Sequence, residues 1–293
     1  MTSNIDCLLA NSGAFQALFA NGFLSSASAI LVAVAALVVG GYVFRFLLAK
    51  RKSNEKPKRT GMKITASGGT HIGGRENNED AFLLKGDAYI VADGMGGMAC
   101  GEEASAAAIG AFQDTDLEQA NWFEAAVTLA NLRMRELVAE DPRRKRFGTT
   151  VTAVRRVAPN QLHVGWSGDS PLFRLRAGVL EQLTEDHSVA VFLWKAGKLS
   201  EAEIATSPYR NVLHKCVNGE HKLPEWDEKT IEIEPGDRYL ICSDGLTDYS
   251  ELSKIAAILG GEGTVEERVQ ALIDNALADA TKDNATAIVI DID

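Results

Sequence analysis

Four aspartates at the ends of predicted strands are the residues of this sequence best suited to chemistry. Asp93 and Asp244 each follow an apolar run and precede a glycine, in Tyr-Ile-Val-Ala-Asp-Gly and Tyr-Leu-Ile-Cys-Ser-Asp-Gly. Asp169 ends a third such run, and Asp283 lies just before a fourth. If these strands are neighbours, the four carboxylates meet at one edge and repel one another unless a cation lies between them.

The oxygen-rich character of this group predicts the kind of cation. Carboxylates and carbonyls select hard divalent ions, Mg²⁺ or Mn²⁺, over zinc. Gly94 follows Asp93 and has no Cβ, so its carbonyl can turn toward a metal ion or its water. A single Asp-Gly pair is usually only a turn, but four strand ends of this kind favour a metal site.

A short polar segment upstream, 73–80, adds a candidate phosphate ligand. Arg75 precedes Glu79 and Asp80 by four and five residues. The two acids suit metal binding or support of the metal ligands, and the planar guanidinium of Arg75 matches a phosphate. Taken alone, Arg75 would more often be a surface ion-pair partner. Divalent cations beside a phosphate-binding arginine predict hydrolysis of a phosphoester by water activated between two metal ions.

The elements that must position these side chains are strands in consecutive groups, which do not alternate strictly with helices. Strands rich in Val, Ile and Thr are predicted at 64–70, 88–93, 148–157, 162–169, 172–178, 229–236, 238–244 and 285–293. Helical periodicity predicts helices at 102–113, 119–140, 188–196, 200–206, 250–259 and 265–280. This order favours an α+β fold in layers over a doubly wound sheet, with 62–293 as one domain.

The front of the chain predicts a membrane anchor. No charged residue occurs between Asp6 and Arg45, and 23–44 is long enough to cross a ~30 Å hydrocarbon layer as a helix. A buried core helix seldom runs this long without a charge, and Asp6 stands where a cleaved signal peptide carries bases. The sequence therefore divides into an N-terminal segment (1–22), one transmembrane helix (23–44), a basic juxtamembrane linker (45–61) and the domain 62–293.

Charge is unevenly spread and predicts the orientation of the anchor. The chain has 40 acidic and 30 basic residues, but 1–59 carries seven bases against two acids, which leaves −15 for 60–293. Because basic flanks stay in the cytoplasm, we expect a single-pass protein of the inner membrane with a cytoplasmic catalytic domain. The acidic domain argues against nucleic acid as a partner. The four cysteines form no C-x-x-C pair. Cysteines spaced in this way are typically reduced thiols.

Short motifs follow one another in a fixed order along 62–293. They are T-H-I-G-G-R-E-N-N-E-D-A-F (70–82), V-A-D-G-M-G-G (91–97), F-G-T-T (147–150), G-D-S (168–170), L-T-E-D-H-S (183–188), R-N-V-L (210–213), G-D-R-Y-L-I-C-S-D-G-L-T-D (236–248) and K-D-N-A-T (282–286). In this order they resemble the bacterial branch of the PP2C (PPM) family of metal-dependent serine/threonine protein phosphatases. The resemblance implies a β-sandwich of two antiparallel sheets flanked by helices, with a binuclear Mn²⁺ or Mg²⁺ site at one end.

The resemblance also implies a role for each strand-end residue. Asp93 would bridge the two tightly bound metal ions, and the Gly94 carbonyl would join one of them. Asp244 and Asp283 would complete the other. Asp169 matches the position at which bacterial members bind a third, weaker metal ion.

The upstream acids, the arginine and the substrate are implied in the same way. Glu79 and Asp80 match the acidic pair of the family, Arg75 matches its phosphate-binding arginine, and 189–213 would be its variable flap. The implied activity is hydrolysis of phosphoserine and phosphothreonine in proteins, acting on the substrates of a partner Ser/Thr kinase. The sequence carries no signal of an oligomeric state.

Two positions depart from the family pattern. Many eukaryotic members have histidine, a proposed general acid, where this chain has Met95, so here a metal-bound water would protonate the leaving group. Pro171 replaces the arginine that commonly follows G-D-S, which removes a backbone donor and a cation beside Asp169. His187, in L-T-E-D-H-S, is interpreted as a structural hydrogen bonder and not as a metal ligand.

Three alternative functions fit the sequence less well. Residues 94–99 fit the dinucleotide-binding pattern G-x-G-x-x-A, but no strand ending in an acid follows near residue 114. Ser167 lacks the second glycine of the G-x-S-x-G motif of serine hydrolases. The third alternative is a catalytically inactive PP2C-like domain used as a membrane-tethered binding module, which the intact acids at 93, 244 and 283 disfavour.

Overall fold

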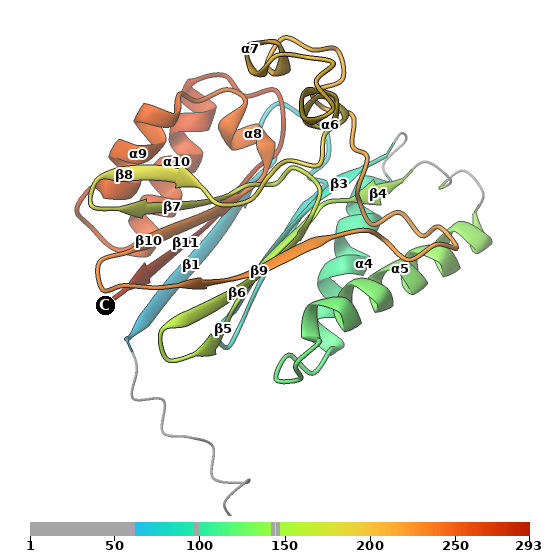
Figure 1. Cartoon of the computed structure of the whole chain (residues 1–293), viewed down its shortest axis with the longest axis horizontal. Helices are drawn as coiled ribbons and strands as arrows, with labels where there is room; N and C mark the ends of the chain where they lie inside the picture. The colour runs from blue at the N-terminus through green and yellow to red at the C-terminus, as the bar shows by residue number, and fades with distance from the viewer. Residues whose placement is uncertain (1–61, 97–99, 142–143, 145–146) are drawn as a thin grey trace, which may run out of the picture. The chain divides into compact units, whose positions relative to one another are not determined.

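The computed structural model describes residues 62–96, 100–141, 144 and 147–293 (Figure 1). The predicted N-terminal segment, transmembrane helix and linker lie outside the described residues. Within the described part of the chain, no helix is both long and apolar enough to cross a membrane.

One antiparallel sheet contains both ends of the described domain. Its strand order is β1-β11-β10-β7-β8. The strands are β1 (Ile64–His71), β7 (Leu172–Arg176), β8 (Val179–Gln182), β10 (Arg238–Cys242) and β11 (Ala285–Ile292).

The second antiparallel sheet lies against the first, with the strand order β2-β3-β5-β6-β9 and β4 paired to β3. Its strands are β2 (Asp80–Lys85), β3 (Ala88–Met95), β4 (Gly148–Thr149), β5 (Val151–Ala158), β6 (Gln161–Ser167) and β9 (Asp227–Glu232). Figure 1 shows the two sheets face to face, with helices on the outer faces.

The helices complete a four-layer sandwich. Helices α4 (Gly101–Asp114) and α5 (Trp122–Glu140) cover the second sheet, and α9 (Leu252–Gly260) and α10 (Val265–Ala278) cover the first. Helix α8 (Asp244–Thr247) follows β10 directly, and α6 (Val189–Lys195) and α7 (Glu201–Ile204) lie in the predicted flap. The predicted α+β architecture of two antiparallel sheets flanked by helices is confirmed.

The central strands are apolar on both faces because each face is buried. Along β11, Val289 packs under the helices of the first sheet, whereas Ile288 and Ile290 pack between the two sheets. Along β3, Ile90 faces α4 and α5, and Val91 faces the other sheet. The alternation of side chains along a strand explains why such strands read as continuous hydrophobic runs.

The sequence prediction misplaced or missed several elements of the sandwich. It missed the edge strands β2 and β8 and the short helix α8. The predicted strand 148–157 comprises β4 and β5, which keep one register against β3. Between them, at Thr150, the Asp93 amide donates to the side-chain oxygen Oγ1 at 3.1 Å. The predicted strand 229–236 begins two residues earlier and ends four residues earlier, at 227–232, and a turn with Gly236 at φ 89° follows it.

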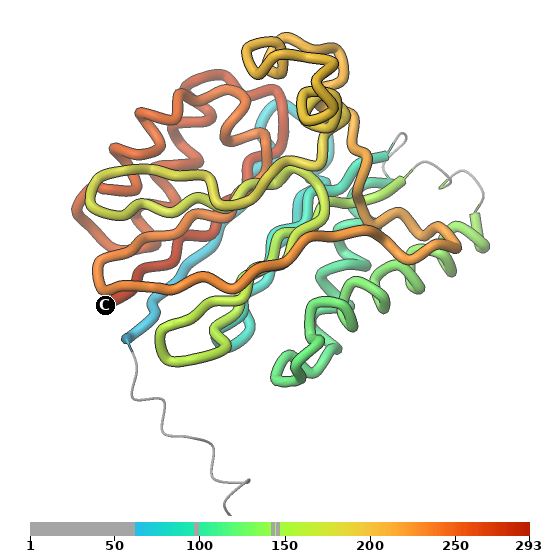
Figure 2. The backbone as a smooth tube through the Cα atoms, in the orientation of Figure 1, coloured from blue at the N-terminus to red at the C-terminus, as the bar shows by residue number. Residues whose placement is uncertain are grey.

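The register of β1 and β11 defines two ends of the sandwich. At one end His71 pairs with Ala285, next to Asp283, and at the other Ile64 pairs with Ile292. Beyond Ile64, the amide of Lys63 donates to the carbonyl of Asp293 at 2.8 Å. Figure 2 shows the described chain entering and ending side by side there. The predicted metal ligands therefore lie at the opposite end from residue 62.

Candidate metal and phosphate site

The structure brings the predicted aspartates together where the two sheets end. Asp93 lies near the end of β3, and its Cα partner across the strand pair is Asp80, the first residue of β2. Asp169 follows β6, Asp244 follows β10, and Asp283 precedes β11. These residues come from both sheets, so the sandwich itself assembles the acidic group.

The F-G-T-T motif fixes the backbone of Asp93. The amide of Asp93 donates to Thr150 Oγ1 at 3.1 Å, and Thr149 Oγ1 donates to the Asp93 carbonyl at 2.9 Å. The Thr150 amide donates to the same carbonyl at 2.9 Å. The sequence alone indicated no such role for this motif.

A serine from the other sheet anchors Asp80. Ser243 Oγ donates to Asp80 Oδ2 at 2.6 Å and accepts from the Thr286 amide at 3.0 Å. The second oxygen, Asp80 Oδ1, is buried and has no hydrogen-bond partner among the described atoms. Burial raises the pKa of Asp80 to about 6. A buried carboxylate oxygen without a donor is a position that a cation or its water would satisfy.

The electrostatics of the cluster favour a cation. Burial, followed by the neighbouring carboxylates, raises the pKa of Asp93 and that of Asp244 well above the usual aspartate range. Burial, followed by Asp186 and Asp248, raises the pKa of Asp169 to about 7. Like charges held this close resist ionisation until a positive charge compensates them.

The oxygen ligands of this group therefore suit divalent cations. Their side chains are not arranged around a common point as the ligands of a metal ion would be. Among the described residues, no three His, Cys, Asp or Glu side chains form a preassembled metal site. Asp283 is paired with a cation of the protein itself, since its Oδ2 accepts from Arg75 Nη2 at 2.5 Å. The guanidinium thus compensates the charge of one carboxylate of the group.

Arg75 lies beside the acidic group, paired with Asp283. Its side chain is 51% exposed, which leaves it free to turn toward a ligand. The hydrogen bond to Asp283 is the main factor that raises the pKa of Arg75. Glu79 and Asp244 act in the same direction, which places Arg75 beside the acidic group.

Asn284 holds the segment that carries Arg75. Its Nδ2 donates to the carbonyls of Ile72 and Asn77 at 2.8 and 2.9 Å, and its Oδ1 accepts from the Glu79 amide at 2.8 Å. Asn284 is buried, so these bonds are shielded from water. Sequence reasoning missed this role, and its one signal was that Asn284 adjoins Asp283 in K-D-N-A-T.

Glu79 and Gly94 meet the start of helix α4. Glu79 Oε1 accepts from the Gly101 amide at 3.2 Å, and burial raises the pKa of Glu79. A Cβ at Gly94 would lie 2.0 Å from the Gly101 carbonyl oxygen and 2.6 Å from that of Glu79. Only glycine fits there, which explains the Asp-Gly pair through close packing. Metal binding by Gly94 and Glu79 stays a prediction.

The two departures from the family pattern leave the site intact. Met95 ends β3 and pairs with Gly148. The Pro171 carbonyl accepts from the Cys242 amide at 3.2 Å, so the residue is tied to the end of β10. The preceding Ser170 is held through its Oγ, 2.6 Å from Thr150 Oγ1. Asp169 therefore keeps a fixed backbone despite Pro171.

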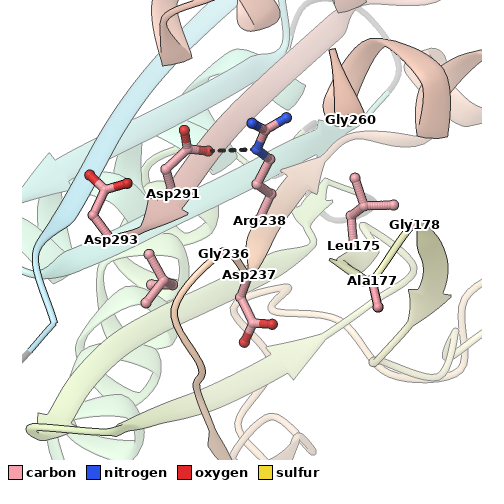
Figure 3. Close-up of a pocket in the computed structure, with 10 residues that line it drawn as sticks. Leu175, Ala177, Gly178, Gly236, Asp237, Arg238, Gly260, Asp291 and Asp293 are labelled. Carbon is pink, nitrogen blue, oxygen red and sulfur yellow. Dashed lines mark ion pairs between the residues drawn. The ribbon is translucent and has the colours of Figure 1, made fainter. Parts of the chain in front are cut away.

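A separate pocket of about 330 Å³ lies at the other end of the first sheet (Figure 3). It is lined by the start of β10 and the end of β11, whereas Asp244 and Asp283 lie at the opposite ends of these strands. Arg238 points across it, with Nε 3.9 Å from Asp291 Oδ1. Arg238 Nη1 donates to the carbonyls of Leu259 and Gly261 and so caps the C-terminal end of α9. This pocket brings together none of the predicted site residues.

Comparison with known proteins points to one family. Residues 67–279 match the family model for protein phosphatase 2C. The serine/threonine protein phosphatase PstP of Mycobacterium tuberculosis is 34% identical over 224 residues, which is 74% of this chain. A putative protein phosphatase 2C-type of Streptococcus pyogenes is 32% identical over 243 residues, or 78% of this chain. The match spans 97% of the streptococcal protein but only 43% of PstP, so this chain corresponds to less than half of PstP.

Solved structures show the same fold. The PPM Ser-Thr phosphatase MsPP of Mycobacterium smegmatis, in complex with cacodylate, has 36% identity and a TM-score of 0.71 over 78% of this chain and 98% of that one. The catalytic domain of PstP, in complex with two manganese ions, has 31% identity and a TM-score of 0.70 over 79% of this chain and 99% of that one.

Proposed function

This chain belongs to the protein phosphatase 2C family, and we propose that it hydrolyses phosphoserine and phosphothreonine in proteins. The observation that carries the proposal is the group of carboxylates from both sheets, with Arg75 beside it. The named phosphatases to which the chain is similar support the same activity. A catalytically inactive binding module is disfavoured, because a domain without chemistry gains nothing from burying mutually repelling acids.

The acids would hold two divalent cations, Mn²⁺ or Mg²⁺, as the PstP structure holds two manganese ions. When bound, such ions polarise phosphoryl oxygens and lower the pKa of an attacking water. Asp93 would hold both ions, because it lies among carboxylates of both sheets, with Asp80 on one and Asp244 on the other. Asp244 and Asp283 lie on the first-sheet side, and Asp169 would hold a third, weaker ion. Gly94, Glu79 and Asp80 would complete the set.

Arg75 would hold the substrate phosphate. Its guanidinium pairs with Asp283 in the structure, and a cation bound by Asp283 would release it. The planar fork can then donate two parallel hydrogen bonds to the phosphate and orient it for in-line attack by water. Met95 has no proton to donate, so the leaving serine or threonine oxygen takes its proton from water.

Hydrolysis of p-nitrophenyl phosphate tests the hydrolase proposal. The full-length chain, freed of metal with EDTA and dialysed, is expected to be inactive and to regain activity when Mn²⁺ or Mg²⁺ is added. Zn²⁺ is the matched control and should restore little activity, since an all-oxygen site selects hard cations. Undiminished hydrolysis in excess chelator would contradict the proposal.

We further propose that the chain is anchored in the inner membrane by 23–44, with its catalytic domain in the cytoplasm. The uncharged stretch and the basic flank after it support this assignment. Strand β1 has eight residues and rises about 3.3 Å per residue, so the carboxylates lie roughly 25 Å from the point where the linker enters. The site thus lies at the opposite end of the domain from residue 62. Its substrates would be phosphoproteins made by a partner Ser/Thr kinase.

Fractionation and a reporter fusion test the anchor. The full chain is expected to sediment with membranes and the fragment 62–293 to stay in the supernatant. A reporter that is active only outside the cytoplasm, fused after Asp293, is expected to give no signal. Recovery of the full chain in the soluble fraction would remove the anchor, and a strong reporter signal would reverse the orientation.

A further inference from the structure

His187 lies buried beneath the turn that carries Asp169. Its Nδ1 accepts from the Gly168 amide at 3.0 Å, and its own amide donates to the Gly168 carbonyl at 3.1 Å. The ring stacks on Trp166, with centroids 6.0 Å apart and planes inclined by 9°. His187 therefore holds both backbone groups of Gly168, next to a candidate metal ligand.

The partners of the ring determine its tautomer. A backbone amide can only donate, so Nδ1 must be the unprotonated nitrogen, and Nε2 carries the hydrogen. Nε2 lies 3.1 Å from Asp227 Oδ2, which accepts that hydrogen. Lys215 Nζ donates to the other oxygen, Asp227 Oδ1, at 2.8 Å and keeps this carboxylate charged. Asp227 thus selects the tautomer that Gly168 requires.

The turn that His187 holds has little freedom to relax. Gly168 has φ 117°, and a Cβ there would lie 2.6 Å from Thr150 Cβ. On the other side of Asp169, Ser170 Oγ lies 2.6 Å from Thr150 Oγ1, which also accepts from the Asp93 amide. The turn is therefore held from two sides, by His187 and by Thr150.

We propose that His187 is a positioning residue, which uses the acceptor Nδ1 to fix the Gly168–Ser170 turn and so to aim Asp169 at its cation. The proposal rests on the proposed function, since it assigns Asp169 to cation binding. Asp227 and Lys215 contribute through the ring and do not themselves reach the site. Partners that orient metal ligands from behind typically change metal affinity by roughly 10–100-fold when they are removed.

Two substitutions of His187 separate its two nitrogens. Asn places its Oδ1 near the position of imidazole Nδ1 and can still accept from Gly168, whereas Gln places its amide near Nε2 and can still donate to Asp227. Mn²⁺ binding to the full chain is measured by calorimetry, and Asp169→Ala defines the part of the isotherm that depends on Asp169. We expect His187→Gln to weaken that part by roughly 10–100-fold and His187→Asn to leave it close to wild type.

Asp227→Asn tests the tautomer directly. The Asn amide can donate to Nε2, which drives the ring hydrogen onto Nδ1, against the Gly168 amide, so this variant should behave like His187→Gln. Asp227 is 43% exposed, so its replacement preserves the core. The matched control is His163→Gln, which replaces a partly buried histidine on β6 beside β9 and should leave Mn²⁺ binding unchanged. Thermal melts verify folding for each variant.

A measurement on the wild-type chain avoids substitution altogether. The ¹⁵N resonances of His187 at pH 7 should show an unprotonated Nδ1 and a protonated Nε2. The opposite tautomer would overturn the proposal. So would wild-type Mn²⁺ binding in both His187→Gln and Asp227→Asn, or an Asp169→Ala variant that binds Mn²⁺ as wild type does. In each of these cases, Mn²⁺-dependent phosphatase activity of the wild-type chain would show that the proposed function stands without this inference.

Discussion

Asp93→Asn is expected to lower turnover by several orders of magnitude while leaving the protein folded, and Asp244→Asn is expected to do the same. Asp93 interacts with carboxylates of both sheets, so its loss affects both cation positions at once. Asn is nearly isosteric but a poor ligand for a hard cation. The measurement is kcat for a phosphothreonine peptide at saturating Mn²⁺, with Asp274→Asn, an exposed change on α10, as the control.

The melting temperature separates loss of chemistry from loss of fold. When folding raises the pKa of a carboxylate, the folded protein loses stability as the pH rises above the pKa that this group has in the unfolded chain. Burial and like charges raise the pKa of Asp93 in this way. At pH 8 without metal, Asp93→Asn should therefore melt no lower than wild type. Normal turnover in either aspartate variant would show that these residues do not bind the catalytic cations.

Arg75→Ala is expected to raise KM for phosphopeptides by roughly 10–100-fold, since a charge-assisted hydrogen bond contributes about 1.5–3 kcal/mol. Arg75→Lys should recover only part of this, because an ammonium cannot reproduce the bidentate fork. Mn²⁺ binding should stay near normal in both. Arg174→Ala, which removes an arginine that pairs with Glu181 at 2.5 Å on the first sheet, is the control. Wild-type kinetics in Arg75→Ala would make Arg75 a surface ion-pair partner of Asp283.

The strands that carry the site could be predicted because the sandwich buries them on both faces. Strands β3, β10 and β11 read as continuous apolar runs, so their ends, and the aspartates there, could be located. The edge strand β8 is largely exposed and has no such run. Strand β2 begins at Asp80, directly after a polar segment, so no apolar run marks where the strand starts.

The hydrogen bonds that position the site could not be predicted from the spacing of residues in the sequence. Ser243 donates to Asp80 across 163 residues, and Asn284 accepts from the Glu79 amide across 205. Such pairs are fixed only when the two sheets pack, and the local patterns of helix and strand do not encode them. The ion pair between Arg75 and Asp283 is a finding of the same kind, since it joins a predicted phosphate ligand to a predicted metal ligand.

Phosphate release from a phosphothreonine peptide by the full-length chain is the most direct test of the central claim. Purified protein is stripped with EDTA, dialysed, and assayed with and without added Mn²⁺, with Asp93→Asn prepared in parallel. The structure predicts release that requires Mn²⁺ and is nearly absent in the variant. Release that is equal with and without Mn²⁺, or equal in Asp93→Asn and wild type, would contradict the assignment of these carboxylates to a cation-dependent phosphatase site.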